Sequence, residues 1–107
     1  MGRSISLKQP ADLLLSISGE GIYPGSVIFI DHFGNLVTNL RMAGIQKARI
    51  FIDGNEIPLK KTYADAEIGE PLALTGSRGL LEIAVRNGSA EQMFDAGYGS
   101  KIEVEIK

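Results

Sequence analysis

Cysteine is absent from the 107 residues, and histidine occurs once, as His32. Without cysteine there is neither a disulfide nor a thiolate metal site, and one histidine cannot form a zinc site by itself. The 13 acidic and 11 basic residues are mixed along the chain and give a net charge of −2. No basic run is present to follow a phosphate backbone, so we expect no nucleic-acid partner. We likewise expect no metal and no cofactor.

Long apolar runs are also lacking. The apolar stretches are far too short to span a bilayer, and the N-terminus does not show the basic-then-apolar layout of a secretory signal. We therefore expect a cytoplasmic protein without a membrane partner. The chain is 44% hydrophobic, which is ordinary for one globular domain, and its 13 glycines divide it into many short segments. The division into many short segments favours an all-β architecture.

Short segments of β type, bounded by turn residues, follow one another along the chain. Asp53-Gly54-Asn55 is a strong hairpin signal. Residues 101–107 alternate strictly between polar and apolar, as in a strand with one buried face. Ser89 begins a short helix predicted over residues 90–94. The expected strands are residues 13–17, 27–30, 36–40, 49–52, 56–59, 71–74, 80–85 and 101–107.

These segments predict an antiparallel β-barrel or closed sandwich with one short helix. We expect Pro58 to lie on an edge of the sheet, because proline cannot donate to a strand ladder. We divide the chain into residues 1–24, an N-terminal extension with a candidate strand, and residues 25–107, the β-barrel domain.

Between two of the expected strands lies the segment Asp31-His32-Phe33-Gly34-Asn35. Glycine and asparagine accept positive φ values easily, so a tight turn explains part of it. A carboxylate at Asp31 and an amide at Asn35 could also surround one pocket, with Phe33 as a flat apolar wall. Such a pocket would suit a ligand with a cation and a planar heterocycle. Local chemistry leaves the turn and the binding loop equally open, and we interpret His32 as a loop residue.

A second polar turn, Gly76-Ser77-Arg78-Gly79, separates two apolar runs. By itself it is typical of a β-hairpin with an exposed arginine. Glu82 and Glu91 are the carboxylates that acid–base chemistry could recruit. The spacing places no partner beside either, so we assign them structural or solvated roles.

Taken together, the two segments resemble the C-terminal domain of the S-adenosylmethionine hydroxide adenosyltransferases, a family that includes fluorinating and chlorinating enzymes. The resemblance runs from about Gly25 to the C-terminus. It consists, in order, of Ile30-Asp31-x-Phe33-Gly34-Asn35-Leu36-x-Thr38-Asn39, Thr62-Tyr63, Gly76-Ser77-x-Gly79-x-Leu81-Glu82-Ile83-Ala84-Val85 and the helix start Gly88-Ser89-Ala90.

The resemblance implies that S-adenosylmethionine lies between this β-domain of one subunit and the N-terminal α/β domain of its neighbour in a homotrimer. Asp31 would hold the ammonium group of the methionine part, and Ser77 and Arg78 its carboxylate. These roles agree with the chemistry, since an acid suits a cation and the arginine fork suits a carboxylate.

For the nucleoside, the resemblance implies that Asn35 contacts an edge of the adenine. Phe33 and Tyr63 would supply aromatic walls, and the main chain around Asn87 a further adenine contact. Halogenating members have a tryptophan where this chain has Val37, which favours the hydroxide-using branch.

Three hypotheses remain. In the family the N-terminal domain carries the residues that position water and the ribose, and no segment here resembles it. The first hypothesis is therefore the S-adenosylmethionine-binding domain of a hydrolase that produces adenosine and methionine, inactive without its α/β partner domain. The second is a stand-alone β-barrel that binds an adenosine-type ligand without catalysis; for the chain in general we expect S-adenosylmethionine or adenosine as the ligand. The third is a structural or oligomerisation module in which the loop residues only cap strands.

Overall fold

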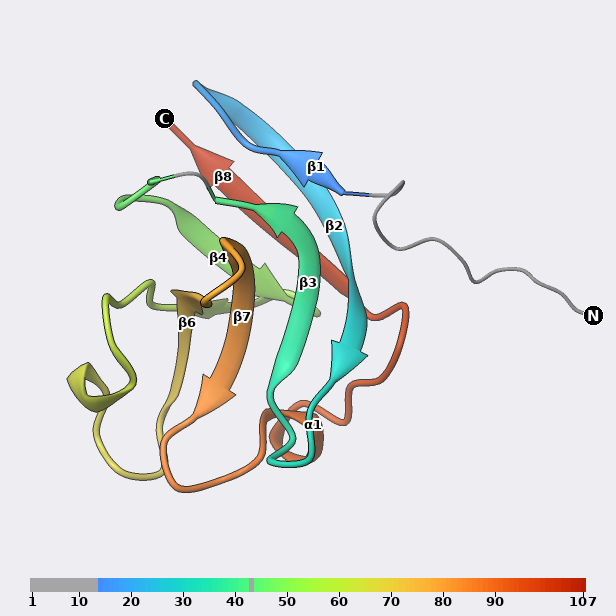
Figure 1. Cartoon of the computed structure of the whole chain (residues 1–107), viewed down its shortest axis with the longest axis vertical. Helices are drawn as coiled ribbons and strands as arrows, with labels where there is room; N and C mark the ends of the chain where they lie inside the picture. Colours follow the sequence, from blue (N-terminus) through green and yellow to red (C-terminus); the bar gives the residue numbers. More distant parts are fainter. Residues whose placement is uncertain (1–13, 43) are drawn as a thin grey trace, which may run out of the picture.

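A computed structural model describes residues 14–42 and 44–107, which form a nearly closed barrel of antiparallel strands (Figure 1). The predicted all-β fold with one short helix is confirmed. The elements are β1 (Leu15–Ser16), β2 (Gly21–Ile30), β3 (Leu36–Arg41), β4 (Arg49–Ile52), β5 (Asn55–Ile57), the 3₁₀ helix η3 (Tyr63–Asp65), β6 (Pro71–Thr75), β7 (Leu80–Val85), α1 (Ala90–Met93) and β8 (Lys101–Ile106).

Neighbouring strands follow the order β5-β4-β8-β2-β3-β7-β6, and β1 adds to β3 in parallel. The two ends of this path meet through the chain that follows β5. The Pro58 carbonyl accepts the Ala73 N–H at 2.8 Å, and the Lys60 N–H donates to the Ala73 carbonyl at 2.8 Å. Pro58 thus follows the edge strand β5 directly and contributes only its carbonyl, as a residue without an N–H must.

The long strand β2 belongs to both halves of the barrel. Residues 21–26 pair with β8, and residues 27–30 pair with β3 across a bulge at Ile28. Gly25 lies where these halves meet, and a Cβ there would be 2.5 Å from Leu40 Cγ. Because only glycine permits this approach, β2 can bend around a core of aliphatic side chains. The largest fully buried ones are Ile17, Leu36, Leu40, Met42, Ile50, Ile52, Ile57, Leu72, Leu81, Ile83, Ile102 and Val104.

Local predictions can be compared with these elements. Asp53 and Gly54 have φ values of 50° and 81° in the predicted hairpin between β4 and β5. Strand β8 buries Ile102 and Val104, which confirms its alternation. Of the strand expected at residues 13–17, residue 13 lies outside the described residues and β1 covers two positions.

The division of the chain at residue 25 stays a prediction. Ile17 is buried in the barrel core, and β2 begins at Gly21. The described part of the N-terminal segment is therefore packed onto the same core as the rest. Among the described residues, no helix has the length and apolar character needed to cross a membrane.

Candidate functional site

The loop between β2 and β3 is organised around the Asp31 carboxylate. Its Oδ1 accepts the backbone N–H groups of Phe33 and Asn35 at 2.9 and 3.0 Å, and its Oδ2 accepts the Asn35 side-chain amide at 3.1 Å. The Gly34 N–H donates to the Asp31 carbonyl at 2.9 Å. Aspartate commonly stabilises a turn in this way. Asp31 therefore has a structural role in the loop, whatever it binds.

The same loop packs against the start of α1, and both lie at one end of the barrel (Figure 1). Gly34 has a φ of +85°, and a Cβ there would be 2.0 Å from Ser89 Oγ. The Gly34 carbonyl accepts the Glu91 N–H at 2.9 Å. Ser89 caps α1 as predicted, its Oγ accepting the Gln92 N–H at 3.2 Å. Both the backbone and the space at Gly34 thus require glycine.

A first hollow, of about 520 Å³, opens beside this loop. Its size falls within the range typical of small-molecule sites. Phe33 is 66% exposed there, and its ring packs against that of His32 with the centroids 4.0 Å apart. The lining residues are Phe33, Asn35, Tyr63, Asn87 and Gly88. All four residues that the resemblance assigns to the nucleoside therefore lie in one hollow.

Tyr63 is held in this hollow by its hydroxyl group. The hydroxyl donates to the Val85 carbonyl at 2.8 Å and accepts the Asn87 N–H at 2.9 Å. Asn87 has a φ of 59°, so the chain turns directly beside the ring. The Asn87 N–H is therefore occupied by Tyr63, and only other main-chain atoms of this turn remain for a ligand.

Arg86 is a supporting residue that sequence reasoning did not single out. Its guanidinium donates to the Ala64 and Ala66 carbonyls at 3.2 and 2.8 Å. These bonds tie η3, which begins at Tyr63, to the end of β7. Contacts between a side chain and a distant carbonyl leave no periodic signal in a sequence. Only the structure therefore shows the role of Arg86.

The turn that carries Ser77 and Arg78 lies at the opposite end of β7 from α1 (Figure 1). It is closed by the Gly79 N–H, which donates to the Gly76 carbonyl at 2.9 Å. The Gly79 carbonyl accepts the Met42 N–H at 2.8 Å, which fixes the turn to the end of β3. Both Ser77 and Arg78 are exposed. A firmly held backbone therefore presents two exposed side chains.

A second hollow, of about 370 Å³, runs across β2, β3 and β7. Strand register places Phe29 opposite Val37 and Val37 opposite Glu82, which gives a row of side chains across the three strands. The lining residues are Ile28, Phe29, Asp31, Val37, Ser77, Arg78, Leu80 and Glu82. The three residues assigned to the methionine part thus share this hollow, with Asp31 and Arg78 coming from opposite ends of the sheet.

Glu82 is the residue in this hollow that sequence reasoning assigned only a structural or solvated role. Partial burial raises the pKa of its carboxyl group, the negative charge of Asp31 raises it further, and Arg78 opposes both effects. A carboxylate inside the apolar run of β7 was the available sequence signal. The signal could not be interpreted without the register that sets Glu82 beside Val37.

Asn35 lines the first hollow and Asp31 the second, and the bond between their side chains links one wall residue of each hollow. Along them lie, in order, an aromatic and amide region, an acidic group, and an arginine with a serine. This order could accept an extended ligand with a planar base at one end and an α-amino acid at the other. In residues 14–42 and 44–107, no group of three or more acidic or histidine side chains is placed to hold a metal ion.

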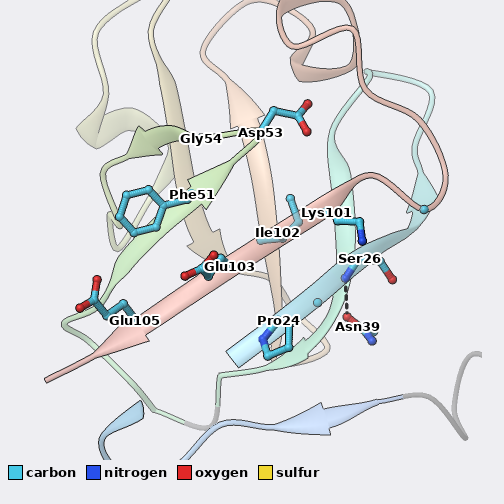
Figure 2. Close-up of a pocket in the computed structure, with 12 residues that line it drawn as sticks. Pro24, Ser26, Asn39, Phe51, Asp53, Gly54, Lys101, Ile102, Glu103 and Glu105 are labelled. Atoms are coloured by element: carbon cyan, nitrogen blue, oxygen red, sulfur yellow. Dashed lines mark hydrogen bonds between the residues drawn. The ribbon is translucent and has the colours of Figure 1, made fainter. Parts of the chain in front are cut away.

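A further hollow lies on the outer face of β2, β8 and β4 (Figure 2). Alternating side chains of β8, among them Lys101, Glu103 and Glu105, point into it, and Asn39 Oδ1 accepts the Ser26 N–H at 2.9 Å at its edge. None of the seven predicted site residues lines it. We interpret this surface as the solvated face of the strands.

The chain was compared with known proteins. The description of the matching family is SAM hydroxide adenosyltransferase C-terminal domain, and the match covers residues 25–103. An (R)-S-adenosyl-L-methionine hydrolase of Thermus thermophilus is 29% identical over 96% of this chain and 48% of its own length. A fluorinase of Actinopolyspora mzabensis is 31% identical over 83% of this chain and 34% of its own length. The chain thus spans half or less of these relatives.

Two solved structures have a similar fold. A conserved hypothetical protein from Thermus thermophilus superposes with a TM-score of 0.70 and 33% identity, over 76% of this chain and 34% of its own. An uncharacterized conserved protein from Thermotoga maritima superposes with a TM-score of 0.65 and 31% identity, over 76% of this chain and 35% of its own. Fold, motif order and sequence match all lead to one conclusion: this chain belongs to the SAM hydroxide adenosyltransferase family, as a C-terminal domain.

Proposed function

We propose that this chain is the S-adenosylmethionine-binding half of a hydrolase that releases adenosine and methionine. The observation that carries the proposal is the set of groups in two hollows whose wall residues Asn35 and Asp31 are bonded to each other. Phe33, Asn35 and Tyr63 lie in the hollow proposed for adenine, and Asp31 and Arg78 lie in the hollow proposed for the amino acid. The chemistry of these groups suits S-adenosylmethionine, which has a planar base at one end and an α-amino acid at the other.

The reaction proposed for the complete enzyme replaces one bond at C5′ of the ribose. Water oxygen forms a bond to C5′ as the C5′–S bond breaks, and the electron pair of that bond neutralises the sulfonium. The water then releases a proton to solvent. The residues named above would bind and orient the two ends of the substrate, which brings a reacting centre into place without taking part in its chemistry.

The opposite wall of the site is proposed to come from an N-terminal α/β domain in a cytoplasmic homotrimer. Two aromatic side chains at the hollows, Phe29 and Phe33, are 53% and 66% exposed. Ligand pockets normally enclose most of the ligand surface, so these open hollows need a second surface to cover them. The lengths of the relatives leave room for such a domain.

An amide NMR titration of the chain tests the proposal, because it detects even millimolar binding. S-adenosylmethionine should shift the amides of residues 31–35, 77–79 and 87–88. Adenosine should shift only residues 31–35 and 87–88. Absence of any shift at millimolar ligand, or shifts confined to the outer face of β8, would contradict the assignment.

A second candidate, a β-barrel that binds the ligand without catalysis, is favoured by one observation. All seven proposed contact residues lie in this chain. Tight binding by the chain alone, with no gain when an α/β domain of the family is added, would favour this candidate over the first.

A further inference from the structure

Glu82, on β7, lines the hollow proposed for the amino-acid end of the ligand. It pairs with Val37 on one side and Leu74 on the other. Its side chain runs toward the Ser77–Arg78 turn, because a Cβ on Gly76 would be 1.9 Å from Glu82 Oε2. The absence of a side chain at Gly76 therefore leaves the space that the carboxylate occupies.

This carboxylate is partly desolvated and unpaired. Within residues 14–42 and 44–107, no hydrogen bond or ion pair joins the Glu82 side chain to another residue. The charged groups that face it in the hollow are Asp31 on one side and Arg78 on the other. Burying an unpaired charge destabilises a fold, and carboxylates in such surroundings are concentrated at binding sites.

Asp31 cannot satisfy an ammonium group by itself. Its Oδ1 already accepts two backbone N–H groups, and its Oδ2 accepts the Asn35 amide. A carboxylate has about four acceptor positions, whereas an ammonium group has three donors. With three positions of Asp31 occupied inside the loop, further acceptors must come from elsewhere in the hollow.

We propose that Glu82 is a second acceptor for the ligand ammonium and makes this subsite specific for an amino-acid end group. The proposal rests on the proposed function of the same site. Its carboxylate lies between the acid that receives one face of the ammonium and the arginine that receives the neighbouring carboxylate. The role is one of positioning and specificity, since Glu82 does not approach the reacting C5′–S bond in this arrangement.

Glu82→Gln tests this role, because it removes the charge and keeps the shape. Four probes are titrated against the chain: S-adenosylmethionine, S-adenosylhomocysteine, decarboxylated S-adenosylmethionine and 5′-methylthioadenosine. The first three carry the ammonium, and we expect each to bind roughly tenfold more weakly, a difference of about 1.4 kcal/mol. The fourth lacks the amino acid and should bind unchanged. Glu103→Gln, the same substitution on the outer face of β8, should affect none of them.

Each other pattern overturns the proposal. Unchanged binding of decarboxylated S-adenosylmethionine would show that Glu82 acts by holding Arg78. Unchanged binding of S-adenosylhomocysteine would show that it contacts the sulfonium instead. If all four probes bind the variant as they bind the native chain, only the role of Glu82 fails. If the native chain binds no S-adenosylmethionine, the proposed function fails and this role with it.

Discussion

The Asn35 side-chain amide donates to Asp31 Oδ2 at 3.1 Å, so the residue proposed for adenine and the residue proposed for the ammonium hold each other in place. The bond also links a wall residue of the first hollow to a wall residue of the second. A loop built in this way positions both ends of a ligand from one short segment. Its geometry is set before the ligand arrives, which reduces the ordering that binding requires.

Substitution of Asp31 should affect both folding and binding. Asp31→Ala removes the acceptor of two backbone N–H groups and one amide, all exposed or half-buried, and each such bond typically contributes about 0.5–1.5 kcal/mol. Thermal melts should therefore show a clear loss of stability. Asp31→Asn keeps one acceptor oxygen and should recover part of it. Equal melting temperatures for the native chain and Asp31→Ala would contradict the loop geometry described above.

Arg78 should behave differently. It is exposed on a turn, and no hydrogen bond or ion pair within the described ranges depends on it. Arg78→Ala should leave the melting temperature nearly unchanged, since exposed substitutions usually stay within about 0.5 kcal/mol. Affinity for S-adenosylmethionine, measured by calorimetry with the α/β partner domain present, should fall by at least roughly tenfold, or about 1.4 kcal/mol.

Arg78→Lys separates charge from geometry. Lysine keeps the positive charge but not the planar fork that binds a carboxylate at two points, so it should restore only part of the affinity. Lys101→Ala, which removes a charge from the other face of the barrel, serves as the control. Should Arg78→Ala retain full affinity and lose stability, the turn has a structural role only.

Much of the fold was predictable because its signals are local. The positive φ pair at Asp53 and Gly54, the alternation of β8 and the cap at Ser89 each follow from a few neighbouring residues. A barrel or closed sandwich was predicted, but the way in which its ends close was not. The closure depends on contacts between the chain after Pro58 and Ala73, which are far apart in the sequence and leave no periodic trace.

For the site, too, local features were predictable and contacts between distant residues were not. Polar residues in turns identified Asp31, Asn35 and Arg78 as candidates, and resemblance supplied their proposed roles. The sequence could not show that Asp31 is already bonded within its loop, or that Glu82 lies on the same face. Both facts depend on loop conformation and strand register, where a shift of one residue would move every side chain to the other face.

Gly34 and Gly54 offer a matched pair of glycine substitutions. Both have positive φ, +85° and +81°, but a Cβ at Gly34 would be 2.0 Å from Ser89 Oγ whereas Gly54 is open. Gly54→Ala should cost about 1–2 kcal/mol, the penalty of the left-handed backbone alone. Gly34→Ala should cost clearly more and should separate the loop from α1. Equal losses in chemical denaturation would show that the contact with α1 is unimportant.

The purified chain alone should not hydrolyse S-adenosylmethionine. Its candidate contact residues bind the ends of the substrate, and none is positioned by the proposed arrangement to activate water at C5′. Adenosine formation, followed by chromatography, should not exceed the rate in buffer. Hydrolysis above that rate, lost in Asp31→Asn, would place catalytic groups within this chain.

The charge of Glu82 should make the fold less stable at neutral pH than it would otherwise be. Burial and the neighbouring Asp31 raise the pKa of Glu82 in the folded state above its ordinary value of 4.5. The folded state therefore binds this proton more tightly than the unfolded state, and stability falls as pH rises from the ordinary pKa through the raised one.

Glu82→Gln removes this effect, so it should raise the melting temperature at pH 7. The gain should shrink as pH falls below the raised pKa and vanish well below the ordinary pKa of 4.5, where Glu82 is protonated in both states. Glu103→Gln should show no such pH-dependent gain. A variant that is more stable and yet binds S-adenosylmethionine less well would show that the unpaired carboxylate is kept for the ligand rather than for the fold. A lower melting temperature for Glu82→Gln at pH 7 would instead mean that the carboxylate has a stabilising partner in the folded chain.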